Sequence, residues 1–260
     1  MTSPVRWGIL STAKIGLTKV IPGMRKSERL TVAAIASRSL PAAQAAATAL
    51  GIAQAHGSYE ALLADPDIEA IYNPLPNHLH VPMTLAAARA GKHVLCEKPM
   101  ALRAADLEVL RPYAHLVHLH EAFMVRHHPQ WIATRDLVRQ GAIGELRYVQ
   151  VPFSYFNADP ANIRNQADIG GGALYDIGCY AVVAGRWFFE SEPERVSATL
   201  ERDPAFGTDR NTSGWLAFSG GRQLVFSVST QAAPHQRITL VGTQGRIEIE
   251  IPFNAPPDQP

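Results

Sequence analysis

The sequence predicts an α/β protein, in which a doubly wound parallel sheet is followed by an α+β domain with an open antiparallel sheet. From Val5 to about His120, short β-branched runs alternate with longer segments rich in alanine and leucine, which is typical of stacked βαβ units. From Arg195 onward, apolar and polar side chains alternate with a period of two. Strands that follow one another without helices pair antiparallel and commonly bury one face only.

The first half of the chain is expected to contain five strands and five helices. The predicted strands are Val5–Leu10, Leu30–Ala36, Glu69–Tyr72, His93–Leu95 and Leu116–His120. The predicted helices are Ile15–Lys26, Pro41–Leu50, Tyr59–Ala64, Val81–Ala90 and Ala104–Ala114. Pro22 lies inside the first of these helices, and we expect it to kink that helix or end it early.

The second half begins near Ala122, which gives predicted domains at residues 1–122 and 123–260. A helix is expected at Gln130–Arg139, a strand at Leu146–Phe156, and a further helix from the glycine triplet at 170–172 to about Phe189. The predicted strands of the last segment are Arg195–Glu201, Gly214–Phe218, Gln223–Ser229, Ile238–Val241 and Arg246–Ile251.

Composition and charge exclude several classes of protein. Hydrophobic residues make up 47% and charged residues 18% of the 260 residues, which argues against a disordered chain or a coiled coil. The formal net charge of +1 leaves no basic excess for nucleic acid or an anionic membrane. Two cysteines are too few for a disulfide framework, and the sequence shows neither a secretory signal nor a membrane-spanning apolar run. We therefore expect a soluble, cytoplasmic protein.

The turn after the first strand has small residues at the places where a dinucleotide fingerprint has glycine. Ser11, Ala13 and Gly16 occupy the G-x-G-x-x-G positions, and only Gly16 is glycine. A plain tight turn is the alternative interpretation. Its place in the first βαβ unit favours a Rossmann-type site, in which the backbone approaches a pyrophosphate at a helix N-terminus. We expect Ser11, Thr12, Ala13 and Ile15 to contact the cofactor.

The end of the second strand indicates which dinucleotide is bound. An NAD site usually has a carboxylate on the ribose here, but this sequence has Ser37 and Arg38. A hydroxyl and a guanidinium can instead hold a 2′-phosphate, which favours NADP over NAD. The alternative is a solvated arginine in a loop.

Two further motifs follow strands at the same edge of the predicted sheet, where ligands bind in open α/β folds. Pro74, Asn77 and His80 lie in the first motif, and we expect them to contact the cofactor; Asn77 can equally cap the next helix. Its two histidines have no acidic partner nearby, so we expect no metal. Glu97 and Lys98 emerge from the next strand and are locked by a proline, either as site residues or as an ion pair at a strand end.

The glycine triplet at 170–172 opens a helix that carries Asp176 and Tyr180, four residues apart on one face. Such a triplet gives a ligand close access to the backbone. A core role is the alternative for Tyr180, because most aromatic residues in helices simply pack. Arg126 lies in a cationic segment at the domain crossover, which can equally be a packed linker.

Taken together, four motifs of this sequence resemble the glucose-fructose oxidoreductase / inositol dehydrogenase (Gfo/Idh/MocA) family. They are Trp7–Gly16, Cys96–Pro99, Glu121–Met124 and Gly170–Gly178. The chain looks most similar to glucose-fructose oxidoreductase and dimeric dihydrodiol dehydrogenase, which bind NADP. The resemblance implies that Lys98 and Tyr180 are catalytic, with Asp176 and Arg126 orienting the substrate or the nicotinamide ring. Members of the family usually continue past residue 260, so we expect final strands of the second sheet to be missing.

The resemblance implies hydride transfer between NADP and a carbon of an aldopyranose, a polyol or a trans-dihydrodiol. The alternatives are a cofactor-dependent glycosidase of the same family and a non-catalytic NADP-binding regulator. Where inositol-dehydrogenase-like members have Asp-x-x-x-His, this sequence has Asp176 and Tyr180, which makes a phenol the expected base. A one-sided sheet also predicts a homodimer or a higher homo-oligomer.

Overall fold

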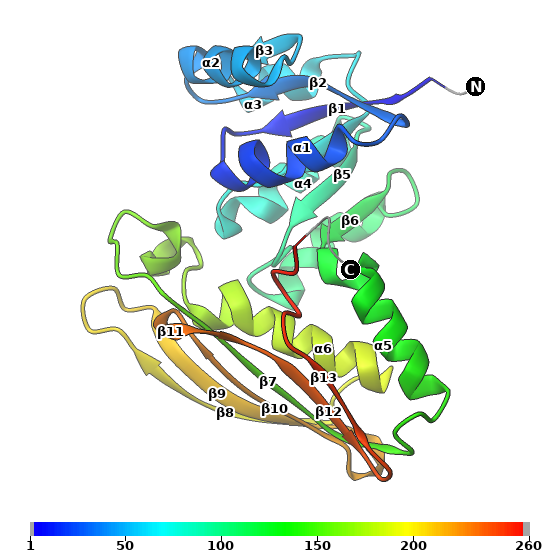
Figure 1. The fold of residues 1–260 in the computed structure, drawn as a ribbon. Helices are drawn as coiled ribbons and strands as arrows, with labels where there is room; N and C mark the ends of the chain where they lie inside the picture. The colour runs from blue at the N-terminus through cyan, green and yellow to red at the C-terminus, as the bar shows by residue number, and fades with distance from the viewer. Residues whose placement is uncertain (1–2, 257–260) are drawn as a thin grey trace. The chain divides into compact units, whose positions relative to one another are not determined.

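The computed structural model of the chain describes residues 3–256. The chain divides after Ala122 into two compact units, which we call unit 1 (residues 1–122) and unit 2 (residues 123–260). Each unit contains one sheet with helices packed against it, and its hydrophobic core is made of its own residues (Figure 1).

Unit 1 is a six-stranded parallel sheet in the order β3-β2-β1-β4-β5-β6. The chain builds outward from β1 in one direction and then from β4 in the other, so the order reverses between these two strands. A ligand site is expected at this point, outside the carboxyl ends of the strands. The strands are β1 (Val5–Leu10), β2 (Leu30–Ala36), β3 (Gln54–His56), β4 (Ala70–Asn73), β5 (His93–Glu97) and β6 (Leu119–Ala122).

The helices of unit 1 are α1 (Ile21–Met24), α2 (Leu40–Leu50), α3 (Tyr59–Ala64) and α4 (His80–Arg89). A π-helical turn at Gly16–Val20 precedes α1, so the single helix predicted at Ile15–Lys26 consists of two segments. Pro22 lies in the first turn of α1, where the missing N–H costs no hydrogen bond. Ser39 and Ser58 are the N-caps of α2 and α3, and their hydroxyls accept hydrogen bonds from the backbone N–H groups of Ala42 and Ala61.

Three predictions for unit 1 were wrong in detail. The short strand β3 was missed, since three residues are too few to show a period. The last strand lies at Leu119–Ala122 instead of Leu116–His120. The segment Ala104–Tyr113 forms 3₁₀ turns instead of an α-helix, and Pro112 inside it has no N–H to donate.

Unit 2 has a seven-stranded sheet whose main path runs β13-β12-β7-β10-β9-β8, with β11 also paired to β7. The prediction of an antiparallel sheet was wrong for one pair, because β10 runs parallel to β7. The antiparallel succession β8-β9-β10 returns β10 to the direction of β7. The strands are β7 (Leu146–Phe156), β8 (Arg195–Arg202), β9 (Asp209–Ala217), β10 (Gln223–Ser229), β11 (Gln231–Gln236), β12 (Ile238–Gly242) and β13 (Arg246–Ile249).

Helices α5 (Pro129–Arg139) and α6 (Cys179–Phe189) lie on the same face of this sheet (Figure 1). A π-helical turn at Leu174–Gly178 leads into α6. Phe218 and Ile249 are buried in the core between the sheet and the helices, whereas Val225 points to the opposite face and is 43% exposed. Within the described residues that opposite face carries no helix, which makes it the open face of the sheet.

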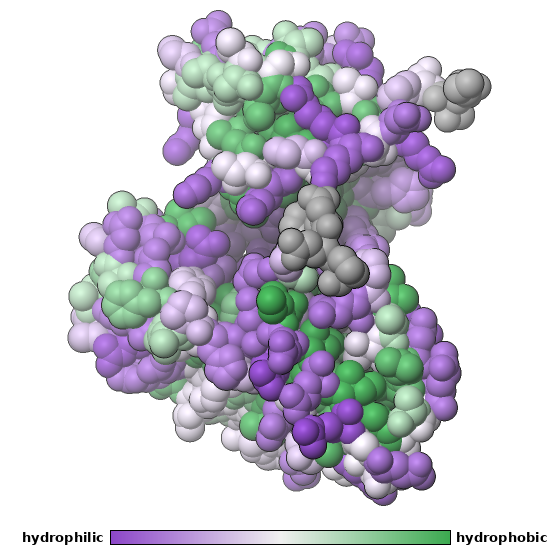
Figure 2. Space-filling view, in the orientation of Figure 1, coloured by the Kyte–Doolittle hydropathy of each residue, from purple (hydrophilic) through white to green (hydrophobic). Residues whose placement is uncertain are grey.

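Hydrophilic and hydrophobic residues are interspersed on the visible face of each unit in Figure 2. Among residues 3–256, no helix combines the length and the apolar character needed to cross a membrane.

Candidate active site

The first βα turn of unit 1 has an unusual backbone conformation at Ser11. Ser11 has a left-handed backbone (φ +74°), which is uncommon outside glycine, and its hydroxyl accepts a hydrogen bond from the Ala13 N–H at 3.2 Å. The N–H of Ser11 donates to the carbonyl of Ala36 on β2 at 2.9 Å. Thr12 and Ala13 are half-buried and Ile15 is exposed, so a ligand can reach this turn.

The residues after β2 present hydrogen-bond donors. Ser37 is half-buried, and its N–H donates to the carbonyl of His56 at 3.1 Å. Arg38 is exposed and lies beside the hydroxyl of Tyr59. Burial raises the pKa of Tyr59 above its ordinary value, although the positive charge of Arg38 acts in the opposite direction. The Ser37–Ser39 turn contains no carboxylate, so an anionic group that binds here meets no negative charge from these residues.

The loop after β4 is held by a buried network. Asn73 is completely buried, and its amide donates to the carbonyl of His80 at 3.1 Å and to the hydroxyl of Thr84 at 3.3 Å. The His80 ring is 1% exposed and lies 2.7 Å from the carbonyl oxygen of Pro99 and 2.6 Å from that of Leu75. Burial lowers the pKa of His80, so a neutral ring donates only one of these two hydrogen bonds.

This position changes the interpretation of the first strand-end motif. His80, which was predicted to contact the cofactor, lies inside the protein and joins the loop after β4 to the loop after β5. Pro74 is also buried, near Gly16, while Asn77 is half-buried. Of these three residues, only Asn77 is not buried.

The segment from Glu97 to Met100 is anchored at both ends. The Tyr72 hydroxyl, which is fully buried, donates to Glu97 Oε1 at 2.6 Å, and the N–H of Met100 donates to Glu121 Oε1 at 2.7 Å. Burial and then the charge of Glu97 raise the pKa of Tyr72, which keeps its phenol protonated. These contacts fix the backbone around Lys98 at the carboxyl end of β5, and the Lys98–Pro99 peptide bond is cis.

In unit 2, Asp176 is the centre of a charged network. Its Oδ2 accepts hydrogen bonds from the Tyr155 hydroxyl at 2.6 Å and from Arg164 Nε at 2.8 Å. Burial raises the pKa of Tyr155, and the charge of Asp176 adds to this effect. Burial disfavours the charge on Arg164, but Asp176, Tyr155 and Tyr180 outweigh it and raise the pKa of the guanidinium. The structure therefore brings Tyr155 and Arg164 together on the Asp176 carboxylate.

Tyr180 packs in the aromatic core of unit 2, which is the alternative that was considered for it. Its ring is 8% exposed and packs edge-on against Phe123 and Phe153, with Phe253 at 5.2 Å between centroids. These aromatic contacts fix the orientation of the ring. Arg126 is exposed, with its guanidinium 5.8 Å from the centre of the Trp187 ring.

The space beside the glycine triplet is filled by other atoms of the protein, whereas the sequence predicted that a ligand would approach the backbone there. A Cβ atom on Gly171 would lie 2.5 Å from the carbonyl oxygen of Arg164, and one on Gly172 would lie 2.0 Å from Asp209 Oδ1. Asp209 is buried, and its Oδ2 accepts hydrogen bonds from the N–H of Leu174 at 2.8 Å and from the hydroxyl of Thr212 at 2.7 Å. A carboxylate from β9 thus holds the start of the segment that carries Asp176 and Tyr180.

Sequence reasoning missed the roles of Asp209 and Tyr72. Asp209 lies 35 residues from the N–H that it accepts, and no motif marks it. Tyr72 resembles any core residue of a buried strand. Tyr155 lies near the end of β7 and Arg164 lies in a 3₁₀ turn, and their pairing with Asp176 could not be read from their spacing in the sequence.

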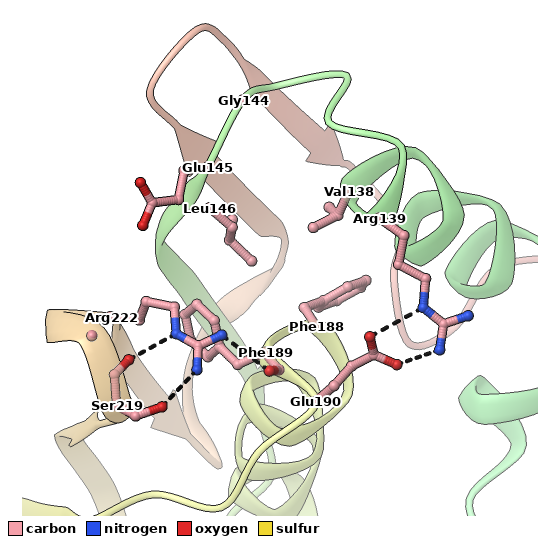
Figure 3. Close-up of a pocket in the computed structure, with 11 residues that line it drawn as sticks. Val138, Arg139, Gly144, Glu145, Leu146, Phe188, Phe189, Glu190, Ser219 and Arg222 are labelled. Atoms are coloured by element: carbon pink, nitrogen blue, oxygen red, sulfur yellow. Dashed lines mark hydrogen bonds and ion pairs between the residues drawn. The ribbon is translucent and has the colours of Figure 1, made fainter.

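A cavity of about 420 Å³ in unit 2 lies away from these residues (Figure 3). Arg222 donates to the carbonyl of Phe189 at 3.1 Å and to that of Ser219 at 2.9 Å, and Arg139 pairs with Glu190. These contacts close the C-terminal end of α6, where free carbonyls need donors. Across residues 3–256, no group of three or more His, Cys, Asp or Glu side chains is arranged to hold a metal ion.

Two sequence profiles of one family cover nearly the whole chain. Residues 5–126 match the profile described as "Oxidoreductase family, NAD-binding Rossmann fold". Residues 131–248 match the GFO/IDH/MocA C-terminal domain.

Characterised proteins show the same similarity. The chain is 42% identical to D-xylose 1-dehydrogenase (NADP(+)) 2 of Haloferax volcanii, over 96% of this chain and 77% of that protein. It is 36% identical to trans-1,2-dihydrobenzene-1,2-diol dehydrogenase of Xenopus laevis, over 94% of this chain and 74% of that protein. The crystal structure of KijD10, a 3-ketoreductase from Actinomadura kijaniata in complex with NADP and TDP-benzene, superposes with a TM-score of 0.91 at 31% identity, covering 97% of this chain and 78% of that one.

Proposed function

The chain belongs to the Gfo/Idh/MocA family of oxidoreductases, and we propose that it is an NADP-dependent dehydrogenase or reductase of sugars. It moves a hydride between the nicotinamide and a carbinol or carbonyl carbon of an aldopyranose, a polyol or a trans-dihydrodiol. The observation that carries this proposal is the anchoring of the Lys98 segment by Tyr72, His80 and Glu121 at the ligand-binding edge of a parallel sheet. The relatives that act on D-xylose and on a dihydrodiol support the substrate class.

The residues of unit 1 fit an NADP molecule. The left-handed backbone at Ser11 and the accessible Thr12, Ala13 and Ile15 form a turn that admits a pyrophosphate next to a helical start. Ser37 and the exposed Arg38 supply donors for a 2′-phosphate. When bound, the cofactor supplies a nicotinamide carbon that accepts or gives the hydride.

Further cofactor contacts are assigned to Asn77, Glu97, Lys98 and Arg126. Pro74 and His80 act indirectly, because they are buried and shape the loops that carry the contacting groups.

Tyr180 is the proposed general acid/base. A free phenol has a pKa near 10, and bringing it to about 7 requires roughly 4 kcal/mol of preferential stabilisation of the phenolate. One ammonium at a few ångströms in an effective dielectric near 20 supplies roughly that amount. We assign this charge to Lys98, with Arg164 as a second cation that interacts with Tyr180 in the structure.

Asp176 acts by orientation. Its carboxylate holds Arg164 and the Tyr155 hydroxyl, and this arrangement fixes the polar groups around Tyr180. A residue that orients in this way contributes through the geometry of the reacting groups.

The open face of unit 2 is the proposed contact of a homodimer. Tyr148, Trp215 and Val225 are each more than one third exposed, and their strand positions place them on the face without helices. Burying such a patch against a second copy would form an isologous interface. We place the enzyme in the cytoplasm, with small molecules rather than nucleic acid or a membrane as its partners.

A reduction screen tests the activity. NADP+ and NAD+ are each supplied with D-xylose and other aldopyranoses, inositols and trans-dihydrodiols, while NADPH or NADH absorbance is followed. We expect turnover with NADP+ and at least one of these classes. Hydrolysis of a glycoside without net reduction would favour the glycosidase, and tight NADP binding without turnover in either direction would favour the regulator.

A further inference from the structure

Among residues 3–256, strand β8 lies at one end of the sheet path of unit 2 and pairs with β9 alone. All eight of its residues are exposed, including Val196 at 70% and Leu200 at 50%. Val196 is paired with Leu216, which is buried in the core, so Val196 and Leu200 lie on the helix-bearing face of the sheet but outside its covered area. An edge strand of this length, with exposed apolar side chains, is a template for pairing with another strand.

The sequence of this strand is self-complementary about Ala198. In the run Glu-Arg-Val-Ser-Ala-Thr-Leu-Glu-Arg (194–202), the residues at equal distances on either side of Ala198 match. Ser197 corresponds to Thr199, Val196 to Leu200, and Arg195 to Glu201, with Glu194 and Arg202 beyond them. Each small polar residue thus corresponds to another small polar residue, each apolar residue to another apolar residue, and each positive charge to a negative charge.

We propose that β8 pairs antiparallel with β8 of a second copy of this chain, about a two-fold axis at Ala198. In that register Arg195 of one copy faces Glu201 of the other, and Val196 faces Leu200. Opposite charges and apolar pairs at directly opposed positions stabilise an antiparallel ladder. Each such pair occurs twice, as an isologous contact requires.

Backbone geometry is compatible with this register. In an antiparallel pair, alternate residues point their N–H and C=O groups to the same edge of the strand. Residues at equal distances from Ala198 are separated by an even number of positions, so facing residues direct their backbone groups alike. A shift by one residue loses this match and places Arg195 opposite Arg202. A shift by two residues removes the Arg195–Glu201 match.

Charged residues on an edge strand often prevent pairing, and that role is the alternative for Arg195 and Glu201. The positions of these charges favour pairing, because they become complementary in the same register that aligns Val196 with Leu200. Glu201 is already held in place, since it accepts hydrogen bonds from Arg210 and, at 2.8 Å, from Asn211. This edge pairing differs from the open-face contact proposed above, although Arg195 borders that face, with its guanidinium 5.9 Å from the centre of the Trp215 ring.

Charge reversal provides the first test, with sedimentation velocity of the full chain over a micromolar concentration series. R195E and E201R each place like charges in register, and we expect about a tenfold weakening of one association step. An equimolar mixture of the two variants restores opposite charges at every contact, so it should associate as the wild type does. V225K, on the open face, is the control and should leave this step intact. If the two single variants behave as the wild type, or their mixture fails to associate, the proposal is wrong.

A cysteine at the symmetry axis tests the register. Directly opposed residues of an antiparallel pair have Cα atoms about 4.5–5.5 Å apart, which suits a disulfide. In the full chain, A198C is expected to form a covalent dimer under mild oxidation. V196C should not, because it faces Leu200, but it should cross-link when mixed with L200C. Equal cross-linking of A198C and V196C alone would show random collision and would overturn the register.

Discussion

The two units build their functional groups in different ways. In unit 1 the candidate residues follow the ends of β1, β2, β4 and β5, and buried contacts between neighbouring loops hold them. In unit 2 Asp176 and Tyr180 lie on one helical segment, which is held by Asp209 from β9 and by aromatic side chains of the core. The parallel sheet therefore gathers its site by topology, while the mixed sheet gathers its site by individual side-chain contacts.

The hydrophobic cores of the two units also differ, in the types of side chain that fill them. The clusters of unit 1 are dominated by alanine and branched aliphatic residues, with Tyr72 as a buried aromatic residue. The cluster of unit 2 is rich in large aromatic residues, and Tyr180 is one of them. A substitution near the site of unit 2 is thus expected to affect packing and chemistry together, whereas in unit 1 the two are more separable.

Replacement of Tyr180 by phenylalanine should separate these effects in unit 2. The ring keeps its contacts with Phe123 and Phe153, and only the proton transfer is lost, so we expect kcat to fall by about 10²–10⁴. The Kd for NADP, measured by fluorescence titration, should stay nearly unchanged. Tyr113→Phe in unit 1 is the matched control. Near-normal turnover of the Tyr180 variant would rule out its assigned role and direct attention to His127, because His80 is buried.

Loss of the carboxylate of Asp209 should damage unit 2 alone. Asp209→Ala leaves the N–H of Leu174 and the buried Thr212 hydroxyl without their acceptor, at a cost of about 2–4 kcal/mol in the free energy of unfolding. We expect a lower melting temperature and a lower kcat, with the Kd for NADP unchanged. Asp209→Asn, which keeps an acceptor oxygen, should recover most of the loss, and the exposed Asp168→Ala should show none. A variant with normal stability would show that Asp209 does not hold the segment.

Removal of the Arg38 side chain should act on unit 1 alone. A hydrogen bond to a charged group contributes about 1.5–3 kcal/mol, so Arg38→Ala should reduce the preference for NADP over NAD by roughly 10- to 150-fold. Isothermal titration with each cofactor measures this ratio. Arg29→Ala, at the opposite end of β2, serves as the control. Equal affinity of the unsubstituted protein for the two cofactors would contradict the role given to Ser37 and Arg38.

The buried ring of His80 predicts a smaller effect that depends on pH. Burial lowers the pKa of the His80 ring in the folded chain. As the pH falls below about 6.5, the ring therefore takes up a proton in the unfolded chain but not yet in the folded chain. Stability from this source is present above that pH and is lost as the pH falls toward the lowered pKa. Urea unfolding between pH 8 and pH 5 should show a shallower loss for His80→Gln than for the wild type. The exposed His115→Gln should retain the wild-type slope, and identical slopes for all three proteins would contradict the assignment.

Much of unit 1 could be predicted because local rules act there. The strands β1 and β2 begin and end where the β-branched pattern predicts, and the chain order of parallel strands places Ser11, Arg38 and Lys98 at carboxyl ends. A parallel βαβ unit fixes which end of each strand meets the ligand edge, so strand position alone locates a candidate residue. The π-helical turns and β3 were not predictable, because hydrogen-bond register and short pairing depend on neighbours distant in the sequence.

The sequence by itself determined the family, most of the strands and helices, and the candidate residues for hydride transfer, since these depend on periodicity and on local motifs. The tertiary structure decided which of those side chains are accessible. It buried His80 between two loops, placed Arg164 and Tyr155 on Asp176, and filled the space beside Gly172 with the Asp209 carboxylate. It also made β10 parallel to β7. These outcomes follow from long-range contacts, whose energies depend on the whole packed unit rather than on any segment of the chain.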